Sequence, residues 1–202
     1  NKVNDGFLTV NNEKLIKVSE LRRTSQHDIL NALAAATVAL NSGAETNAIK
    51  KVLANFKGLP HRIAFIGERA GVSWYNDSKS TTPHSVLAAV SGFENVVLLA
   101  GGRNKGLDLN VLTPVQEHVK HLVAIGEAAD EIEQVFQETL PISKANSMHE
   151  AIEVALKCSE KGDVVLLSPG CTSFDWYGSY AERGEDFERI VQSLIGVEID
   201  DN

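Results

Sequence analysis

The residues best suited to chemistry lie in one polar stretch, Asn76-Asp77-Ser78-Lys79-Ser80-Thr81-Thr82-Pro83, directly after the aromatic segment 72–75. It combines a carboxylate, an ammonium group and four hydroxyls, and it stops at a proline of the kind that opens a helix at its first turn. A helix N-terminus presents free backbone N–H groups and a partial positive charge, so anions bind there readily. The stretch therefore predicts an anion-binding site, although a capped helix beside a surface lysine would give the same pattern.

A second polar loop, 101–108, also follows an apolar segment. It contains Lys105, which would either act as a point charge for a carboxylate or phosphate or be a solvated surface lysine. The loop is rich in glycine but does not match GxGxxG, and no acidic residue lies at the distance expected for a ribose contact. The pattern therefore gives little support to a nicotinamide-dinucleotide site.

A third loop, 168–180, mixes small hydroxyl residues with aromatic ones. Ser173 has no neighbouring base and lies in no GxSxG elbow, which favours a hydrogen-bond donor to an anion over a nucleophile. Cys171 lies in an apolar setting without a paired histidine, so we interpret it as a packed small side chain rather than a nucleophile. Two lysines and several hydroxyls without a general base fit a small dianion, either a dicarboxylate or a phosphate.

The elements that must position these loops are the strands of an α/β domain. Apolar runs that end in glycine or in Ser-Pro-Gly indicate strands buried in a parallel sheet. These runs are 96–100, 122–125 and 164–167. Segments 63–66 and 72–75 bracket a turn and predict a strand pair. Strand–helix alternation over 61–195 predicts a doubly wound, mostly parallel domain, in which ligands bind beyond the carboxyl ends of the strands.

Helices in this region are marked by a cap and by apolar periodicity. Ser147 and Glu150 have the spacing of a capping box. The last helix carries apolar residues at helical spacing, which we interpret as core packing. They are Phe187, Ile190, Val191 and Leu194.

The first 60 residues have a different pattern. Segments 7–10 and 15–18 flank Asn11-Asn12 and predict a hairpin. A helix is expected to begin with the alanine-rich segment 27–36 and to end at Gly43, and a second is expected over about 45–55. The second carries the apolar stripe Ile49, Val52, Leu53 and Phe56. Gly58-Leu59-Pro60 then breaks the periodicity, so we place a domain boundary between 1–60 and 61–202.

Composition is that of a globular protein of one large or two small domains, with 202 residues, 43% hydrophobic and 23% charged. The net charge of -8 argues against a nucleic-acid partner or an anionic membrane. No apolar run approaches the roughly 20 residues of a membrane span. Cys158 and Cys171 show neither CxxC nor metal-ligand spacing, so we expect two buried reduced thiols, no metal site and a cytoplasmic location.

Five motifs occur in order along the chain. They are His27-Asp28-x-x-Asn31, Pro60-His61-Arg62, Asn76-Asp77-Ser78-Lys79-Ser80-Thr81, Gly101-Gly102-x-x-Lys105-Gly106 and Leu167-Ser168-Pro169-x-x-x-Ser173-Phe174-Asp175. Together they resemble the motifs of the Mur ligases, and within that family the members that add D-glutamate. The resemblance covers about residues 7–195. Its discriminating piece is the Asp-Ser-Lys-[small]-Thr run, because sister ligases and folylpolyglutamate synthase carry a histidine- or asparagine-based sequence at this turn.

The resemblance implies a three-domain, ATP-dependent ligase of peptidoglycan precursor synthesis, which joins D-glutamate to UDP-N-acetylmuramoyl-L-alanine through an acyl phosphate. Residues 61–202 would be its Rossmann-like, amino-acid-binding domain and 1–60 the trailing part of its P-loop ATPase domain. D-glutamate would be held by Lys79, which would also be catalytic, and by Thr81, Lys105, Ser173, Phe174 and Tyr180. ATP would be contacted by Asn31, Arg62 and Asp77, and Mg²⁺ mostly by residues outside this sequence.

The sequence departs from the family pattern at two residues and lacks one motif. Asp28 replaces the usual Asn, which argues against an adenine contact there because a carboxylate only accepts hydrogen bonds. Tyr180 replaces the usual Phe, which matters little if the backbone makes the contact. No G-x-x-x-x-G-K-[ST] loop occurs, so we expect a piece of a longer ligase, inactive without its N-terminal and central domains. The alternatives are another Mur- or folylpolyglutamate-type ligase and a non-catalytic α/β ligand-binding module.

Overall fold

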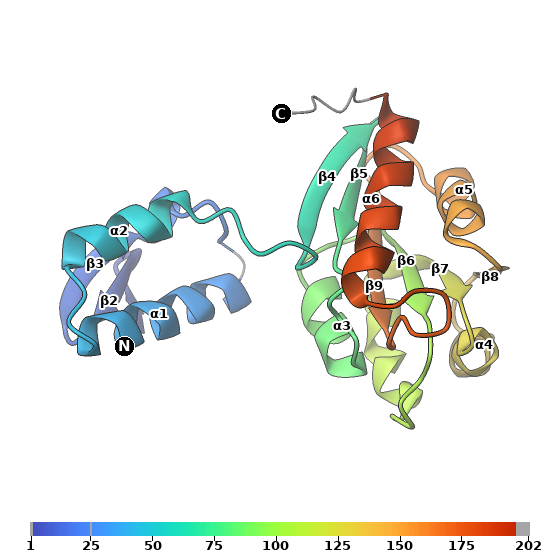
Figure 1. Cartoon of the computed structure of the whole chain (residues 1–202), viewed down its shortest axis with the longest axis horizontal. Helices are drawn as coiled ribbons and strands as arrows, with labels where there is room; N and C mark the ends of the chain where they lie inside the picture. The colour runs from blue at the N-terminus through green and yellow to red at the C-terminus, as the bar shows by residue number, and fades with distance from the viewer. Residues whose placement is uncertain (1, 25, 197–202) are drawn as a thin grey trace. The chain divides into compact units, whose positions relative to one another are not determined.

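A computed structural model describes residues 2–24 and 26–196 of the protein. The chain divides into two units, Asn1–Gly58 and Leu59–Asn202, each with its own sheet and its own hydrophobic core (Figure 1).

The first unit contains a three-stranded antiparallel sheet. Its strands are β1 (Lys2–Asn4), β2 (Phe7–Val10) and β3 (Glu13–Lys17). The predicted hairpin is confirmed, because Asn11 and Asn12 take the positive φ angles, 51° and 67°, that a two-residue turn requires. The sequence does not predict β1, since three exposed residues are too few to show an alternating pattern.

Two helices cover this sheet after a short 3-10 helix. The elements are η1 (Val18–Glu20), α1 (Gln26–Asn41) and α2 (Thr46–Asn55). Leu33 of α1 and Ile49 of α2 are buried in one cluster with the inner residues of β2 and β3. The predicted stripe of α2 is only partly right, because Val52 is 64% and Phe56 47% exposed. Phe56 lies beyond the last helical turn, so the helical period no longer sets the direction of its side chain.

The second unit is built on a six-stranded sheet in the order β4-β5-β9-β6-β7-β8. The strands are β4 (Ala64–Arg69), β5 (Val72–Asn76), β6 (Val96–Gly101), β7 (Val119–Ile125), β8 (Ile142–Ala145) and β9 (Val164–Gly170). β4 and β5 form the predicted antiparallel pair, and all the other pairings are parallel. The last strand in the sequence, β9, therefore lies between β5 and β6.

Helices pack on both faces of this sheet (Figure 1). They are α3 (Pro83–Val90), η2 (Leu109–Glu117), α4 (Ala129–Phe136), α5 (Met148–Cys158) and α6 (Tyr180–Ile195). Alternate residues of β6 enter the two cores: Leu98 packs with α3, η2 and α4, whereas Leu99 packs with α5 and α6. The doubly wound, mostly parallel fold expected from the sequence is confirmed.

Local signals explain where the helices begin. Ser147 Oγ accepts a hydrogen bond from Glu150 N at 3.1 Å, as the capping box predicts, but the Glu150 carboxylate accepts from Asn146 N rather than from the cap residue. Pro83 opens α3, and Thr82 caps it. No helix within 2–24 and 26–196 is both long and apolar enough to cross a membrane.

Candidate functional site

The three predicted loops follow neighbouring strands. β5, β9 and β6 are adjacent and parallel, so their carboxyl ends release the loops at one edge of the sheet. Gly170 N donates a hydrogen bond to Ser80 O at 2.8 Å, which ties the first loop to the third. Arg103 and Thr172 exchange backbone hydrogen bonds of 2.9 and 3.0 Å, which tie the second loop to the third. The fold thus brings together the loops that carry Lys79, Lys105 and Ser173.

Asp77 is buried beneath these loops, and its carboxylate accepts hydrogen bonds from other residues of the protein. Oδ1 accepts a hydrogen bond from Ile63 N (3.2 Å), and Oδ2 accepts from the hydroxyls of Ser168 (2.8 Å) and Ser80. Burial raises the pKa of this carboxyl, and the three hydrogen bonds partly offset the rise. Asp77 therefore joins three segments of the chain. A contact with ATP would have to use a remaining lone pair.

Lys79 and Tyr180 lie against each other. Lys79 Nζ is 5.2 Å from the centre of the Tyr180 ring, a cation–π distance. Lys79 and Thr81 are both partly exposed, and the Tyr180 residue is 36% exposed. Tyr180 is the first residue of α6, where backbone N–H groups have no intrahelical acceptor. An ammonium group, a hydroxyl and a helix start are therefore available to solvent at this edge.

Lys105, Ser173 and Phe174 lie in the other two loops. Lys105 is exposed, and within the described residues neither it nor Lys79 forms an ion pair. Ser173 is 2% exposed, and its carbonyl accepts hydrogen bonds from Trp176 N and Tyr177 N. Phe174 is 59% exposed. The six residues predicted to hold D-glutamate thus all lie in loops of one sheet edge or at the helix start that follows, and their contacts with a ligand stay predictions.

Two glycines allow the second loop to approach its neighbours. Gly101 (φ 133°) and Gly102 (φ 121°) adopt backbone conformations that other residues rarely take. A Cβ on Gly101 would lie 1.9 Å from Ile125 O, and one on Gly102 would lie 2.2 Å from Thr172 O. These two glycines therefore serve close backbone packing, which explains adjacent glycines in this turn without a dinucleotide motif.

The cysteines play no chemical part in the site. Cys171 is 1% exposed, and burial raises the pKa of its thiol to about 11, so it is a packed side chain as predicted. Cys158 is only partly buried, so the expectation of two buried thiols is wrong for this residue. It lies at the last position of α5, where the helix leaves the core.

Sequence reasoning missed the residues that connect the loops to α6. Asn76 Nδ2 donates to Glu188 Oε1 (2.7 Å) and to Gly184 O (3.1 Å), and it lies 2.9 Å from His61 Nδ1. Arg183 is also buried and contacts the first and third loops. A signal existed for Arg183, because it precedes Phe187 by four residues and so shares the inward face of α6.

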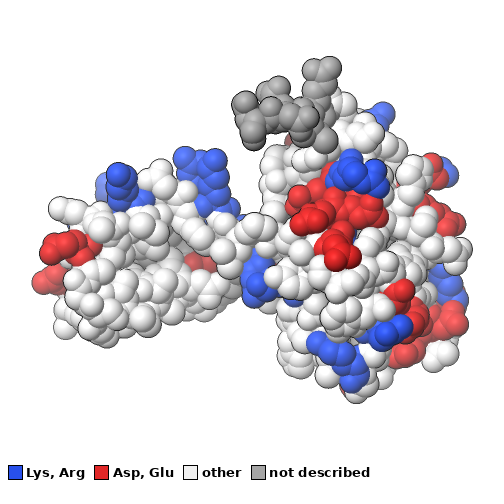
Figure 2. Space-filling view, in the orientation of Figure 1, with Lys and Arg blue, Asp and Glu red and all other residues white. Residues whose placement is uncertain are grey.

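The outward side of α6 is mainly negative. Figure 2 shows carboxylates gathered over this helix, with Glu182 and Glu185 exposed and Arg189 bonded to Asp186 at 2.5 Å. These charges repel an anion from the helix surface. The loops carry the ammonium groups of Lys79 and Lys105, which form no ion pair with any residue that the structure describes, and are therefore the favourable place for an anion.

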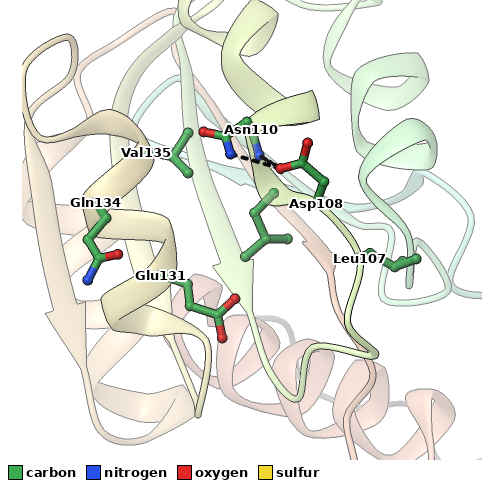
Figure 3. A pocket seen from close by; sticks show the side chains of 7 residues that line it. Leu107, Asp108, Asn110, Glu131, Gln134 and Val135 are labelled. Atoms are coloured by element: carbon green, nitrogen blue, oxygen red, sulfur yellow. Dashed lines mark hydrogen bonds between the residues drawn. The ribbon is translucent and has the colours of Figure 1, made fainter.

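A separate hollow of about 260 Å³ lies beside the second loop, between that loop and α4 (Figure 3). It is lined by Leu107, Asp108, Leu109, Asn110, Glu131, Gln134 and Val135. Asp108 Oδ1 is already engaged by the backbone and side-chain nitrogens of Asn110, at 2.9 and 2.8 Å. With two carboxylates and no basic group in its lining, this hollow does not suit a dianion.

The residues predicted to contact ATP come from both units. Asn31 is exposed on α1 in the first unit, whereas Arg62 is exposed in the second unit, close in sequence to the buried Asp77. Asp28 accepts a hydrogen bond from Arg23 Nε at 3.0 Å, so the carboxylate that departs from the family pattern has an internal role. The contacts of Asn31, Arg62 and Asp77 with ATP stay predictions.

Comparison with known proteins decides the family. Residues 61–171 match the domain described as "Mur ligase, glutamate ligase domain". The chain belongs to the Mur ligase family. It is 39% identical over 182 residues to UDP-N-acetylmuramoylalanine--D-glutamate ligase of Aquifex aeolicus, covering 89% of this chain and 44% of that one. It is 42% identical over 188 residues to the ligase of the same name from Chlamydia caviae, covering 92% and 45%.

A solved Mur ligase shares the fold. The MurF ligase of Thermotoga maritima, in complex with ADP, superposes with a TM-score of 0.58 at 19% identity, covering 82% of this chain and 39% of that one. This Mur ligase chain thus spans less than half the length of the relatives that it matches.

Proposed function

We propose that this chain is part of an ATP-dependent ligase that adds D-glutamate to UDP-N-acetylmuramoyl-L-alanine in peptidoglycan precursor synthesis. Residues 61–202 would bind the amino acid, and residues 1–60 would be the trailing part of the ATP-binding domain. The observation that carries the proposal is that Lys79, Lys105 and Ser173 come from loops at the ends of three adjacent parallel strands. The names of relatives about 40% identical over most of the chain support the choice of amino acid.

Charge and geometry favour a small dicarboxylate at this edge. A dianion needs about two cations and several hydrogen-bond donors, each charged hydrogen bond contributing about 1.5–3 kcal/mol. Lys79 and Lys105 would supply the cations. The hydroxyls of Thr81 and Ser173 would supply donors, together with the backbone N–H of Tyr180. The contribution of these residues would be to hold the amino acid in place for attack, with Lys79 closest to the chemistry, rather than to form a covalent bond with it.

ATP would supply the phosphoryl group that activates the carboxylate of the other substrate. Asn31, Arg62 and Asp77 would contact the nucleotide, and the exposed guanidinium of Arg62 has the charge to meet a phosphate. Among residues 2–24 and 26–196 no group of three or more His, Cys, Asp or Glu could hold a metal ion. A Mg²⁺ ion accompanying ATP would be bound mostly by other parts of the ligase. The inactivity of this chain alone stays a prediction.

The test is an amino-acid profile of the intact protein that contains this sequence. Phosphate release is measured with ATP, UDP-N-acetylmuramoyl-L-alanine and, in turn, D-glutamate, L-glutamate and the amino acids of sister ligases. D-glutamate should be the preferred substrate. Preference for another amino acid would indicate a different ligase of the family, and binding without turnover would indicate a ligand-binding module.

The role of Lys79 is tested in the same assay. Lys79→Met should raise the KM for D-glutamate by about 10–150-fold, the equivalent of one charged hydrogen bond. It should leave the KM for ATP nearly unchanged. Lys157→Met is the control, because Lys157 is exposed on α5. Equal effects of the two variants would contradict the proposed site.

A further inference from the structure

Arg183 is one of the largest fully buried side chains of the described residues, with 1% of its surface exposed. It lies in the first turn of α6, where the helix dipole is unfavourable for a cation. Burial lowers the pKa of its guanidinium to about 10, so the group remains charged at neutral pH. A buried charge at this end of a helix is costly for the fold. The groups that hydrogen-bond to the Arg183 guanidinium therefore indicate what this costly side chain does.

The partners of Arg183 are neutral oxygens of two loops. Nε donates to Ser78 Oγ (2.9 Å), and Nη2 donates to Ser78 O (2.9 Å) and to Cys171 O (3.2 Å). Ser78 Oγ in turn donates to Tyr180 O at 2.8 Å. Asp175 favours the charge electrostatically, but within the described residues no carboxylate is hydrogen-bonded to the guanidinium. Nη1 has no hydrogen-bond partner in the described part of the chain. An arginine that served only to neutralise a buried carboxylate would be paired with one.

The second loop lies beside the same guanidinium. A Cβ on Gly102 would lie 3.1 Å from Arg183 Nη1, so the backbone of this loop passes close to that nitrogen. Each residue touched by Arg183 is close in sequence to a predicted ligand of the amino acid. Ser78 directly precedes Lys79, Cys171 precedes Ser173 by two residues, and Gly102 precedes Lys105 by three. One planar cation thus lies where all three loops meet.

We propose that Arg183 is a positioning residue, which keeps the three loops at the spacing that both carboxylates of the amino-acid substrate require. This inference rests on the proposed function. The planar fork reaches Ser78 and Cys171 at fixed angles, which a single ammonium group cannot reproduce. Without the fork the loops would move independently, and the substrate would lose simultaneous contact with Lys79, Lys105 and Ser173.

The first measurement uses the intact ligase with Arg183→Lys, which keeps the positive charge and removes the fork. The KM for D-glutamate should rise about tenfold or more, while the KM for ATP stays within about twofold of the wild-type value. A purely structural role would reduce the amount of folded enzyme and hence the apparent kcat, without changing either KM. Arg189→Lys is the matched control, because Arg189 is on the same helix but exposed and bonded to Asp186.

The second measurement does not depend on activity. Hydrogen exchange in the chain itself should accelerate in Arg183→Lys at the amides that join the loops, those of Arg103, Gly170 and Thr172. Amides in the middle of β6 and β7 should keep their protection. Should Arg183→Lys not fold, Ser78→Ala removes one of its acceptors and should change the same amides and the same KM, by less.

The outcomes separate the two proposals. A wild-type ligase that does not use D-glutamate refutes the proposed function, whatever the exchange data show. An active ligase whose KM for D-glutamate is unchanged in both variants overturns the positioning role, even if exchange accelerates. A selective rise in that KM together with faster exchange at the amides that join the loops is the expected result.

Discussion

Gly184→Ala is a substitution for which the structure reverses the usual expectation. Alanine in a helix interior is normally more stable than glycine by about 1 kcal/mol. Gly184, however, lies where α6 packs against the first residues of the second unit. A Cβ there would lie 2.3 Å from His61 Nδ1 and 2.9 Å from Asn76 Nδ2. The substitution should therefore destabilise the protein.

The expected size follows from opposing contributions. Overpacking in a filled interior costs about 1–3 kcal/mol. Moving Asn76 aside also weakens its hydrogen bonds with Gly184 O and Glu188 Oε1, each worth about 1 kcal/mol. Against these, helix propensity contributes about 1 kcal/mol in favour of alanine. The free energy of unfolding should fall by about 1–4 kcal/mol.

The assay is urea unfolding followed by tryptophan fluorescence. Both tryptophans of the protein, Trp74 and Trp176, lie in the second unit, so the signal reports on that unit alone. Glu185→Ala, at the next and exposed position of α6, is the control and should change stability by less than about 0.5 kcal/mol.

A double-mutant cycle makes the test specific. His61→Ala removes the nearer of the two obstacles to the new Cβ and leaves Asn76, so Gly184→Ala should cost less in that background than in the wild type. The two substitutions should therefore be coupled. A stabilising Gly184→Ala in the wild-type background, or an equal cost in both backgrounds, would refute the steric reasoning.

Three further predictions follow from the site. Gly102→Ala should lower the free energy of unfolding by about 2–4 kcal/mol in the same assay, because its Cβ would lie 2.2 Å from Thr172 O at a φ of 121°; an unchanged midpoint contradicts this. Burial raises the pKa of the Asp77 carboxyl in the folded protein above its ordinary value of 3.8, so folding favours the protonated form. As the pH rises from 3.8 through the folded-state pKa, the stability of the wild type relative to Asp77→Asn should therefore fall. A wild-type stability that instead rises with pH relative to Asp77→Asn would contradict this prediction. A thiol reagent should modify Cys158 in the native protein and the buried Cys171 only after unfolding; rapid reaction of both would exclude the packing described.

The parallel sheet and the meeting of its loops could be predicted from the sequence because the signals are strong. The runs 96–100, 122–125 and 164–167 within β6, β7 and β9 are apolar on both faces, as buried parallel strands are, and parallel strands release their following loops at one edge. The shorter β8 could not be found this way. Only one of its four residues, Ala145, is buried, so it shows neither a continuous apolar run nor a clear alternation.

The parts of the site that the sequence did not predict depend on packing between distant residues. The approach of Gly184 to His61 arises only when α6 packs on the sheet, and the position carries no local sign of it. The spacing of Arg183 from Phe187 indicates its inward face, but not which loops its guanidinium contacts. Val52 shows a second limit of sequence patterns: it is apolar and has helical spacing, yet its side chain is exposed rather than packed in the core. Charge and periodicity predict which loops meet but not which buried side chain joins them.

The central position of β9 has a consequence for the order in which the protein can form as it is synthesised. Until Val164–Gly170 has left the ribosome, the β4–β5 hairpin has no parallel neighbour, and β6 has a partner on one side only. The sheet, and with it the edge where the three loops meet, can close only after β9 has been synthesised. Binding at that edge would then depend on the last strand of the sheet to be made, since no nascent form that lacks β9 could support it.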